Sequence, residues 1–313
     1  MQATLSKPIT LQGVGLHSGA AVAVTILPAP ADHGICFVRT DVAGADIRIP
    51  ALFYRVVDTE LSTSIADDSG YRVATIEHLM AALAGTGIFN AIVRVDGPEV
   101  PIMDGSAEDF VLAILAAGVQ QLDKPIRAYR IRKAVSLSIG DVKVSLSPLD
   151  GVEIDFRIEF GAAAIGSQAK SLNMANGAFV RELSDSRTFC EFKDVRRIEA
   201  SGLGQGAGLD NVTVVDGSRV LNAGGFRYED ECVRHKMLDA LGDLALAGAP
   251  ILGRYCGVRA GHKSTNQLLR TLFARPDAWD VVHCDAGMSD AMPGYDIKPE
   301  DLWRTETRLP PAA

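Results

Sequence analysis

Between residues 135 and 160 the sequence contains three stretches in which every second residue is apolar. The alternating residues are Val135-Leu137-Ile139, Val142-Val144-Leu146 and Val152-Ile154-Phe156-Ile158-Phe160. Because successive side chains of a strand point to opposite faces, this pattern predicts strands that bury one face only. Gly140-Asp141 and Asp150-Gly151 separate the stretches and are typical of tight turns. We therefore expect an antiparallel meander of three strands.

Helical periodicity follows these strands. It covers 229–247, where Gly248 and Pro250 end it, and returns around 264–274. Strands that come first and helices that come after indicate an α+β fold, because a doubly wound parallel sheet alternates the two.

The first part of the chain contains the same two kinds of segment. Alternation through Val22-Val24-Ile26 and near Ile92 and Val95 predicts strands, and apolar residues at helical spacing predict short amphipathic helices over 75–84 and 107–117. Ser106 with Asp109 three residues later predicts a capping box for the second helix.

The chain length of 313 residues favours about two domains. Leu122-Asp123-Lys124-Pro125 follows a helix that we expect to stop at Gly118, so we place the boundary near residue 124. The predicted domains are 1–124 and 125–313, and no repeat is visible between them at the level of residues.

Composition excludes several classes of protein. Hydrophobic residues make up 47% of the chain, which excludes intrinsic disorder. The net charge of -8 argues against a nucleic-acid-binding protein, so an anionic ligand needs a local basic patch. The five cysteines are scattered and form no C-x-x-C, which argues against a disulfide scaffold and favours a reducing cytoplasm.

No segment of the sequence has the length of a membrane span. The longest apolar run, 110–119, is about half of the ~20 residues that a transmembrane helix needs. The first 19 residues lack the charged head and apolar core of a secretory signal. Glycines at 202, 204, 206 and 208 do not fit the G-x-G-x-x-G spacing of a dinucleotide site, so we expect a loop there.

The segment 233–243 carries the strongest local indication of chemistry. His235, Asp239 and Asp243 are spaced four residues apart and fall on one stripe of the predicted helix. An imidazole and a carboxylate at this spacing lie close enough to bind the same metal ion. Taken alone, the pattern equally fits a solvated polar face, which is the commoner structure.

Glu77-His78 lies near the start of another predicted helix. His78 is a candidate metal ligand, and Glu77 is a candidate base that takes a proton from the attacking water. An exposed helix start would explain the same pair.

A third histidine, His262, lies in a predicted short loop within an acid-free stretch. No Asp or Glu occurs between Leu244 and Pro276, while this stretch contains Arg254, Arg259, Lys263, Arg270 and Arg275. A phosphate-bearing ligand with His262 as general acid fits this composition, and so does a plain basic surface loop.

Taken together, the motifs resemble one family. They are His235-Lys236-Met237-Leu238-Asp239-x-x-Gly242-Asp243, Thr75-Ile76-Glu77-His78-Leu79, Pro101-Ile102-Met103-Asp104-Gly105-Ser106, Ser186-Arg187-Thr188-Phe189 and Ala260-Gly261-His262. In this order they resemble the UDP-3-O-acyl-N-acetylglucosamine deacetylases. The resemblance extends through Gly13–Gly19, Leu209-Asp210-Asn211 and Val220-Leu221-Asn222, and so covers nearly the whole chain.

The resemblance implies a zinc amidohydrolase of lipid A synthesis in Gram-negative bacteria, which releases acetate from a UDP-linked, 3-O-acylated glucosamine. It implies two similar α+β domains with the site between them. His78, His235 and Asp239 are then the zinc ligands, with Fe²⁺ as an alternative metal. Glu77 is the implied general base.

The same resemblance implies roles for the remaining site residues. Thr188 stabilises the oxyanion, and His262, oriented by Asp243, stabilises charge or protonates the leaving amine. Lys236, Arg259 and Phe189 contact the substrate.

An inserted βαβ unit near 190–222 is implied to hold the acyl chain, with Leu203, Val212, Val214 and Val215 as apolar candidates. The sequence differs from many relatives at Glu191, where an aromatic residue is common. This difference concerns the substrate contacts where the nucleotide or the acyl chain enters the site, and it leaves the metal ligands unchanged. No obligatory protein partner, nucleic acid or membrane segment is implied. The alternatives are a zinc deacetylase with another acylated substrate and an inactive relative that binds a nucleotide sugar.

Overall fold

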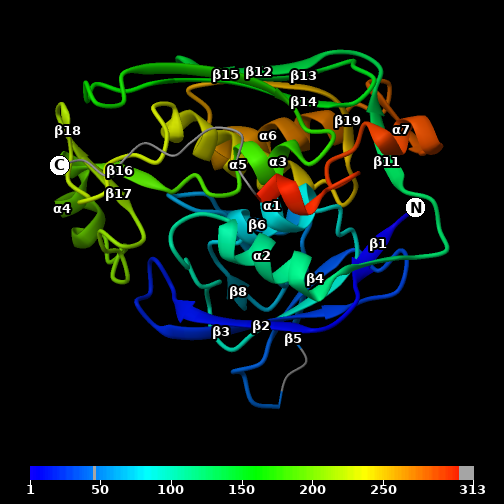
Figure 1. Ribbon diagram of the computed structural model, residues 1–313, viewed down its shortest axis with the longest axis horizontal. Coiled ribbons are helices and arrows are strands. Elements are labelled where there is room, and N and C mark those ends of the chain that lie inside the picture. Colours follow the sequence, from blue (N-terminus) through cyan, green and yellow to red (C-terminus); the bar gives the residue numbers. More distant parts are fainter. Residues whose placement is uncertain (45–46, 303–313) are drawn as a thin grey trace.

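The protein is built as two outer β-sheets with helices between them (Figure 1). The computed structural model describes residues 1–44 and 47–302. The N-terminal sheet has the order β2-β3-β9-β4-β5. Its strands are β2 (Ile9–Val14), β3 (Ala21–Pro28), β4 (Ile35–Arg39), β5 (Ile47–Pro50) and β9 (Ala91–Val95).

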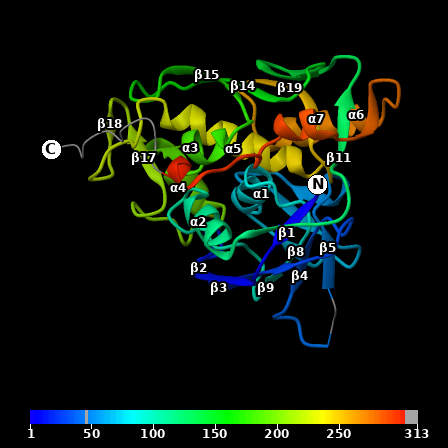
Figure 2. The ribbon, with the colours of Figure 1, turned by 45° about the vertical axis from the view of Figure 1, so that its right-hand side comes forward.

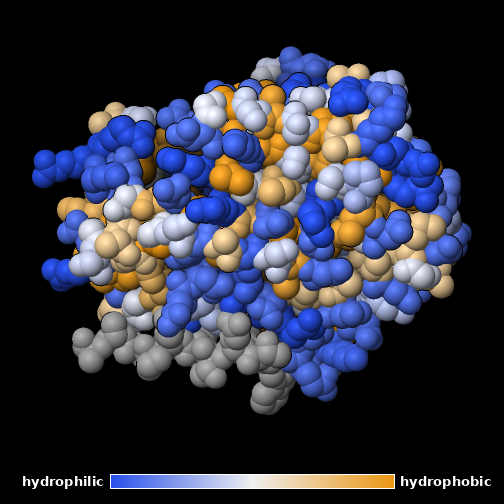
Figure 3. All heavy atoms as spheres, turned by 90° about the horizontal axis from the view of Figure 1, so that it is seen from above, coloured by the Kyte–Doolittle hydropathy of each residue, from blue (hydrophilic) through white to orange (hydrophobic). Residues whose placement is uncertain are grey.

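The C-terminal sheet forms the opposite outer layer. Its strands are β11 (Arg127–Ile131), β12 (Val135–Ile139), β13 (Val142–Ser147), β14 (Val152–Glu159), β15 (Ser167–Asn173), β19 (Ile251–Val258) and β20 (Trp279–His283). Figure 3 shows hydrophilic side chains interspersed with hydrophobic ones on the molecule seen from this side.

Five strands of each sheet are connected in the same way. In the N-terminal sheet, β2/β3, β3/β9 and β4/β5 are antiparallel and β4/β9 is parallel. In the C-terminal sheet, β12/β13, β13/β19 and β14/β15 are antiparallel and β14/β19 is parallel. The two halves therefore share a topology that leaves no trace as a residue repeat, and the α+β fold class is confirmed.

The predicted three-stranded meander is wrong in one pairing. β12 and β13 form the expected hairpin, but β19 lies between β13 and β14. β19 is apolar and is hydrogen-bonded along both edges, so its backbone groups are satisfied inside the sheet. Turn residues at 150–151 report local geometry only and cannot reveal a partner that is about a hundred residues away in sequence.

Four helices fill the space between the sheets (Figure 2). They are α1 (Glu77–Gly85), α2 (Glu108–Ala117), α5 (Glu231–Ala245) and α6 (His262–Phe273). α1 was expected to be amphipathic, but all of its residues except Ala84 are buried. The reason is that α1 packs against α5 and α2 in the layer between the two sheets, so it has no solvent face.

α1 and α5 approach closely at a glycine. A Cβ atom on Gly242 would lie 2.1 Å from the carbonyl oxygen of Glu77 and 3.1 Å from the backbone nitrogen of Ala81. Any side chain at position 242 would therefore push the two helices apart.

Two helix starts differ from their predictions. α2 begins at Glu108, and the predicted capping box does not form, because the Ser106 hydroxyl donates to Asp104 and accepts from the N–H of Glu108. α6 begins at His262, which was expected in a loop. At its end, α2 stops before Gly118 as predicted, where φ is +81°.

The remaining strands and helices are short. They are β1 (Ala3–Leu5), β6 (Val56–Asp58), β7 (Ser64–Ala66), β8 (Arg72–Val73), β10 (Val119–Gln121), β16 (Phe189–Glu191), β17 (Thr213–Asp216), β18 (Arg219–Val220), α3 (Ala178–Glu182), α4 (Phe192–Ala200), α7 (Ala286–Asp290), and the 3-10 turns η1 (Phe53–Arg55) and η2 (Pro299–Leu302). β1 pairs with β10, and β6, β7 and β8 form a small sheet.

β16 and β17 pair in parallel with α4 between them, so the three elements form a βαβ unit. This unit lies at one end of the molecule (Figure 1). The glycines at 202–208 lie in the loop that follows α4, as expected. The boundary near residue 124 falls between β10 and β11 and stays a prediction.

Other expectations concern cysteines and membrane spans. Within the described residues, no disulfide joins any two of the five cysteines. Within residues 1–44 and 47–302, no helix combines the length and the apolar character that crossing a bilayer requires.

We predict that Gly242→Ala lowers the free energy of unfolding by about 1–3 kcal/mol, because the added methyl group overpacks the contact between α1 and α5. Denaturant unfolding measures this. Gly224→Ala is the matched control, since a Cβ there meets no atom within 4 Å. Equal unfolding midpoints for Gly242→Ala and the parent would contradict the packing described here.

Candidate metal centre

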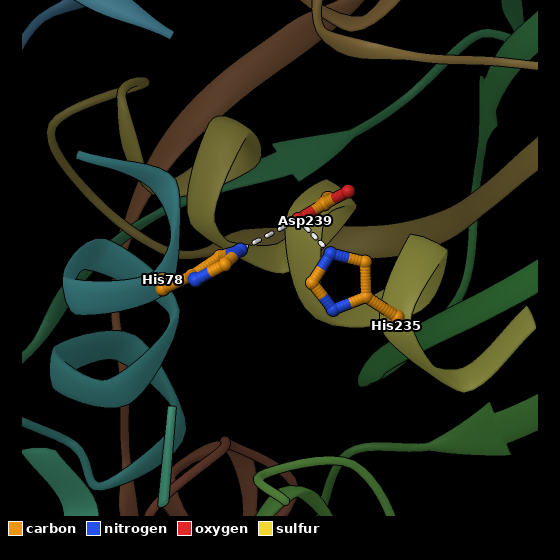
Figure 4. Close-up of side chains that lie close together, drawn as sticks. All are labelled: His78, His235 and Asp239. Atoms are coloured by element: carbon orange, nitrogen blue, oxygen red, sulfur yellow. Dashed lines mark ion pairs between the residues drawn. The ribbon is translucent and has the colours of Figure 1, made fainter. Parts of the chain in front are cut away.

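Three buried side chains from two helices meet at the interface between the sheets (Figure 4). His78 comes from α1, and His235 and Asp239 come from successive turns of α5. The Asp239 Oδ1 atom lies 3.5 Å from His78 Nε2 and 3.3 Å from His235 Nε2. All three candidate ligand atoms lie within 4.8 Å of one another.

The protonation of His235 leaves one nitrogen free for a metal. Its Nδ1 lies 3.0 Å from the Ser186 carbonyl oxygen, which only accepts, so Nδ1 carries the proton. Burial lowers the pKa of His235 to about 3, so the ring is neutral and Nε2 keeps its lone pair.

Asp239 Oδ1, the third candidate ligand atom, also has a lone pair available for a metal. Asp239 Oδ1 is buried and finds no hydrogen-bond donor within the described residues. Since the unprotonated His235 Nε2 faces it, two lone pairs point at each other. A cation between these atoms removes the repulsion, so the donor set fits a metal ion.

The other oxygen of Asp239 is held by Lys236. Lys236 Nζ donates to Asp239 Oδ2 over 2.6 Å. Although burial opposes the charged form, the Lys236 ammonium beside it holds the pKa of Asp239 well below its usual value. Asp239 is therefore a carboxylate with one oxygen fixed by the protein and the other free.

Glu77 lies beside these ligands at the start of α1. Its side chain is 3% exposed, which overturns the exposed helix start as an explanation. Oε2 accepts the backbone N–H of Thr63 over 2.9 Å, and burial raises the pKa of Glu77. A carboxylate held by one oxygen and shifted toward neutrality is suited to accept a proton.

His262 faces Glu77 across the site. Its Nε2 lies 3.9 Å from Glu77 Oε1, and its Nδ1 lies 2.9 Å from Asp243 Oδ2. Burial alone would lower the pKa of His262, but the Asp243 carboxylate raises it to about 9. His262 is therefore an imidazolium at neutral pH, with Nδ1 donating to Asp243 and Nε2–H facing the site.

Asp243 is itself held by a residue that the sequence patterns did not indicate. The Thr63 hydroxyl donates to Asp243 Oδ1 over 2.6 Å, and the Thr63 backbone donates to Glu77. Thr63 lies between Ser62 and Ser64, and no periodicity or motif singles it out.

A cavity of about 450 Å³ opens at this centre. Its lining includes the three candidate ligands together with Glu77, His262, Lys236, Thr188 and Phe189. Phe160, Ile139, Val142 and Leu61 add an apolar wall that motif analysis missed. A cavity of this size with a few convergent polar groups is typical of a small-molecule site.

Phe189 joins the centre to the apolar wall. Its ring packs edge-on against Phe160 at 5.3 Å and against His235 at 6.2 Å, measured between ring centroids. Thr188, the preceding residue, is anchored by its N–H to the Gly105 carbonyl over 2.8 Å.

The basic residues of the acid-free stretch do not form a common patch around the cavity. Of the five, Lys263 alone is among the described lining residues. Arg254 pairs with Glu153, Arg275 pairs with Asp277, and Arg270 donates to the backbone carbonyls of Phe53 and Val56. Acids from outside the stretch lie beside Arg254 and Arg275, which the composition of the stretch alone cannot show, so the expected basic patch reduces to one lysine.

Arg259 also lies outside that lining. Its guanidinium is 3.7 Å from Asp141 and 3.9 Å from Glu159. A contact between Arg259 and the substrate stays a prediction.

A second cavity, of about 440 Å³, lies between Met80 and Leu83 of α1 and Leu241 and Leu244 of α5. None of the candidate site residues lines it within the described part of the chain. The chemistry therefore belongs to the first cavity.

Two imidazoles and one carboxylate beside a buried second carboxylate form the donor arrangement of a mononuclear metallohydrolase. The comparisons with known proteins narrow this class. Residues 2–274 match the LpxC family, described as UDP-3-O-acyl N-acetylglycosamine deacetylase. The chain belongs to this family.

Curated relatives extend over most of the chain. A UDP-3-O-acyl-N-acetylglucosamine deacetylase of Phenylobacterium zucineum is 49% identical over 280 residues, which are 90% of this chain and 96% of the relative. The protein of the same name from Myxococcus xanthus is 48% identical over 281 residues, 90% and 89% of the two chains. That from Shewanella oneidensis is 43% identical over 299 residues, 94% and 97% of the two chains.

We predict that His78→Ala and Asp239→Ala each remove the bound metal from the purified protein, because each deletes one of three ligands. Metal analysis of the isolated variants measures this. His283→Ala is the control, since His283 is exposed and lies outside the cluster. Full metal occupancy in either ligand variant would refute the site.

Proposed function

We propose that this chain hydrolyses the N-acetyl group of UDP-3-O-acyl-N-acetylglucosamine, releases acetate, and serves lipid A biosynthesis in the cytoplasm. The observation that carries the proposal is the uncompensated Asp239 Oδ1 between two histidine nitrogens, with Glu77 and protonated His262 beside it. Membership of the family and relatives of this name over 90% of the chain support the same reaction.

Zinc is the metal that we propose, held by His78, His235 and Asp239. In a tetrahedral zinc site with bonds of about 2.0–2.1 Å, neighbouring ligand atoms lie roughly 3.3 Å apart. The separations of 3.3 Å and 3.5 Å from Asp239 Oδ1 agree with this value. Fe²⁺ is a substitute that the same ligands accept.

When bound, the metal would act as a Lewis acid that polarises the acetyl carbonyl and lowers the pKa of the attacking water. Glu77 accepts the proton of the attacking water through Oε1, the oxygen that faces His262, while Thr63 holds the other oxygen. The Thr188 hydroxyl stabilises the oxyanion that forms on the former carbonyl oxygen.

The protonated His262, oriented by Asp243, then donates its Nε2 proton to the amine nitrogen as the C–N bond breaks. Glu77 is the base and His262 is the acid. The pKa of each is raised, by burial for Glu77 and by the Asp243 carboxylate for His262, which is the direction that each role needs. Lys236 keeps Asp239 charged and presents a cation to the substrate.

The remaining parts of the substrate have candidate contacts. Phe189 and the apolar wall with Phe160 offer a surface to the acyl chain, and the βαβ unit of β16, α4 and β17 extends it. In that unit Val212 is buried against Leu16 and Ile102, with Val214 and Cys190 packed beside them. Arg259 and Lys263 are the candidate contacts for the diphosphate. We propose no obligatory protein partner.

We predict that Glu77→Gln retains the metal and lowers kcat by about 10²–10⁴-fold, because the amide cannot accept the proton. Acetate release with UDP-3-O-acyl-N-acetylglucosamine and metal analysis of the same sample measure this. Glu300→Gln, which alters an exposed carboxylate, is the control. An active Glu77→Gln enzyme would exclude Glu77 as the base.

We predict that Asp243→Asn moves the high-pH limb of kcat/KM to lower pH. The reaction needs protonated His262, so activity is lost as pH rises through a pKa that Asp243 raises to about 9. Removing the carboxylate charge lowers that pKa and brings the loss to lower pH. The pH profile of kcat/KM between about pH 6 and 10 measures the shift, and an unmoved limb would exclude this role for the His262–Asp243 pair.

A further inference from the structure

Glu231 occupies the first turn of α5, four residues before His235 on the same face of the helix. It therefore extends the stripe of His235, Asp239 and Asp243 by one turn. Its side chain is 1% exposed and lies outside the cavity lining. A fully buried carboxylate needs donors, and this one has four.

Three of the four donors belong to Arg187. The Arg187 backbone N–H and Nε donate to Glu231 Oε1 over 3.0 and 2.8 Å, and Nη2 donates to Oε2 over 3.1 Å. The fourth donor is the backbone N–H of Arg227, 2.6 Å from Oε2. The ion pair is bidentate, because Arg187 donates to both oxygens of Glu231. Glu231 Oε1 also accepts the backbone N–H of Arg187, so Glu231 holds both the side chain and the backbone of Arg187.

Arg187 lies between two residues of the site. Before it, the Ser186 carbonyl accepts the proton of His235 Nδ1 and so determines which nitrogen of His235 faces the metal. After it, Thr188 lines the cavity. Holding the backbone of Arg187 therefore holds both neighbours.

The contacts close a ring. They lead from Glu231 on α5 to Arg187, along the chain to Ser186, and back to His235 one turn further along α5. Arg227, whose backbone N–H donates to Glu231, connects these contacts to the N-terminal half. Its guanidinium donates to the Asp185 carbonyl over 2.6 Å and to the Asp104 carboxylate over 2.8 Å.

We propose that the Arg187–Glu231 pair is a positioning device for the metal ligand His235 and for Thr188. It keeps the Ser186 carbonyl where Nδ1–H of His235 must donate to it, so that Nε2 stays free and aimed at Asp239. This inference rests on the proposed function, since it assumes that His235 binds the metal.

The test compares Arg187→Lys and Glu231→Gln with the parent, with Glu229→Gln as the control that removes an exposed charge two residues away. Zinc affinity is measured by competition with a chelator, and kcat, KM and the near-ultraviolet circular dichroism are measured on the same preparations. Arg187→Lys keeps the charge but cannot form the bidentate pair, so it is decisive if Glu231→Gln does not fold.

We expect folded Arg187→Lys and Glu231→Gln to bind zinc about 10–100-fold more weakly than the parent. At saturating zinc we expect kcat to fall with KM little changed, because Thr188 acts on the transition state. Glu229→Gln should match the parent in all respects.

Parent-like zinc affinity and kcat in folded Arg187→Lys would overturn the inference and leave the pair as a structural ion pair only. If the parent itself bound no zinc or released no acetate, the proposed function would fail instead. The two failures are therefore distinguishable in one set of measurements.

Discussion

The close contact of α1 with α5 is the constraint on which the rest of the structure depends. Gly242 lets the backbone of α1 lie directly on α5, with a hypothetical Cβ only 2.1 Å from the Glu77 carbonyl oxygen. This contact brings Glu77 and His78 of one helix to His235, Asp239 and Asp243 of the other. Each half of the chain supplies one helix, and neither half contains the full set of groups.

Burial then determines what these groups can do. It raises the pKa of Glu77 and lowers that of His235, which favours a base and a neutral ligand, while the Asp243 carboxylate outweighs burial and keeps His262 charged. Hydrogen bonds from the Thr63 backbone, from Lys236 and to the Ser186 carbonyl each hold one atom of Glu77, Asp239 and His235 and leave the other free. These three residues line one cavity.

Local patterns predicted the parts of this arrangement that lie within one helix. His235, Asp239 and Asp243 share a face because four-residue spacing guarantees it, and the α+β class follows from strand and helix periodicity. His78 joins them from a helix more than 150 residues earlier in the sequence, and only the resemblance to a family connected the two. The pairing of β14 with β19 and the acids opposite Arg254 and Arg259 were missed for the same reason, because they depend on distant segments. Glu231 continued the stripe, but an acid in the first turn of a helix is common and did not stand out.

The central claim is that one metal ion is held between α1 and α5 by two histidines and one aspartate. Anomalous diffraction from crystals of the zinc-loaded protein, recorded at the zinc absorption edge, tests it most directly. The account predicts a single strong peak within about 2.0–2.2 Å of His78 Nε2, His235 Nε2 and Asp239 Oδ1. A peak at any other group of side chains, or none between these three, would contradict it.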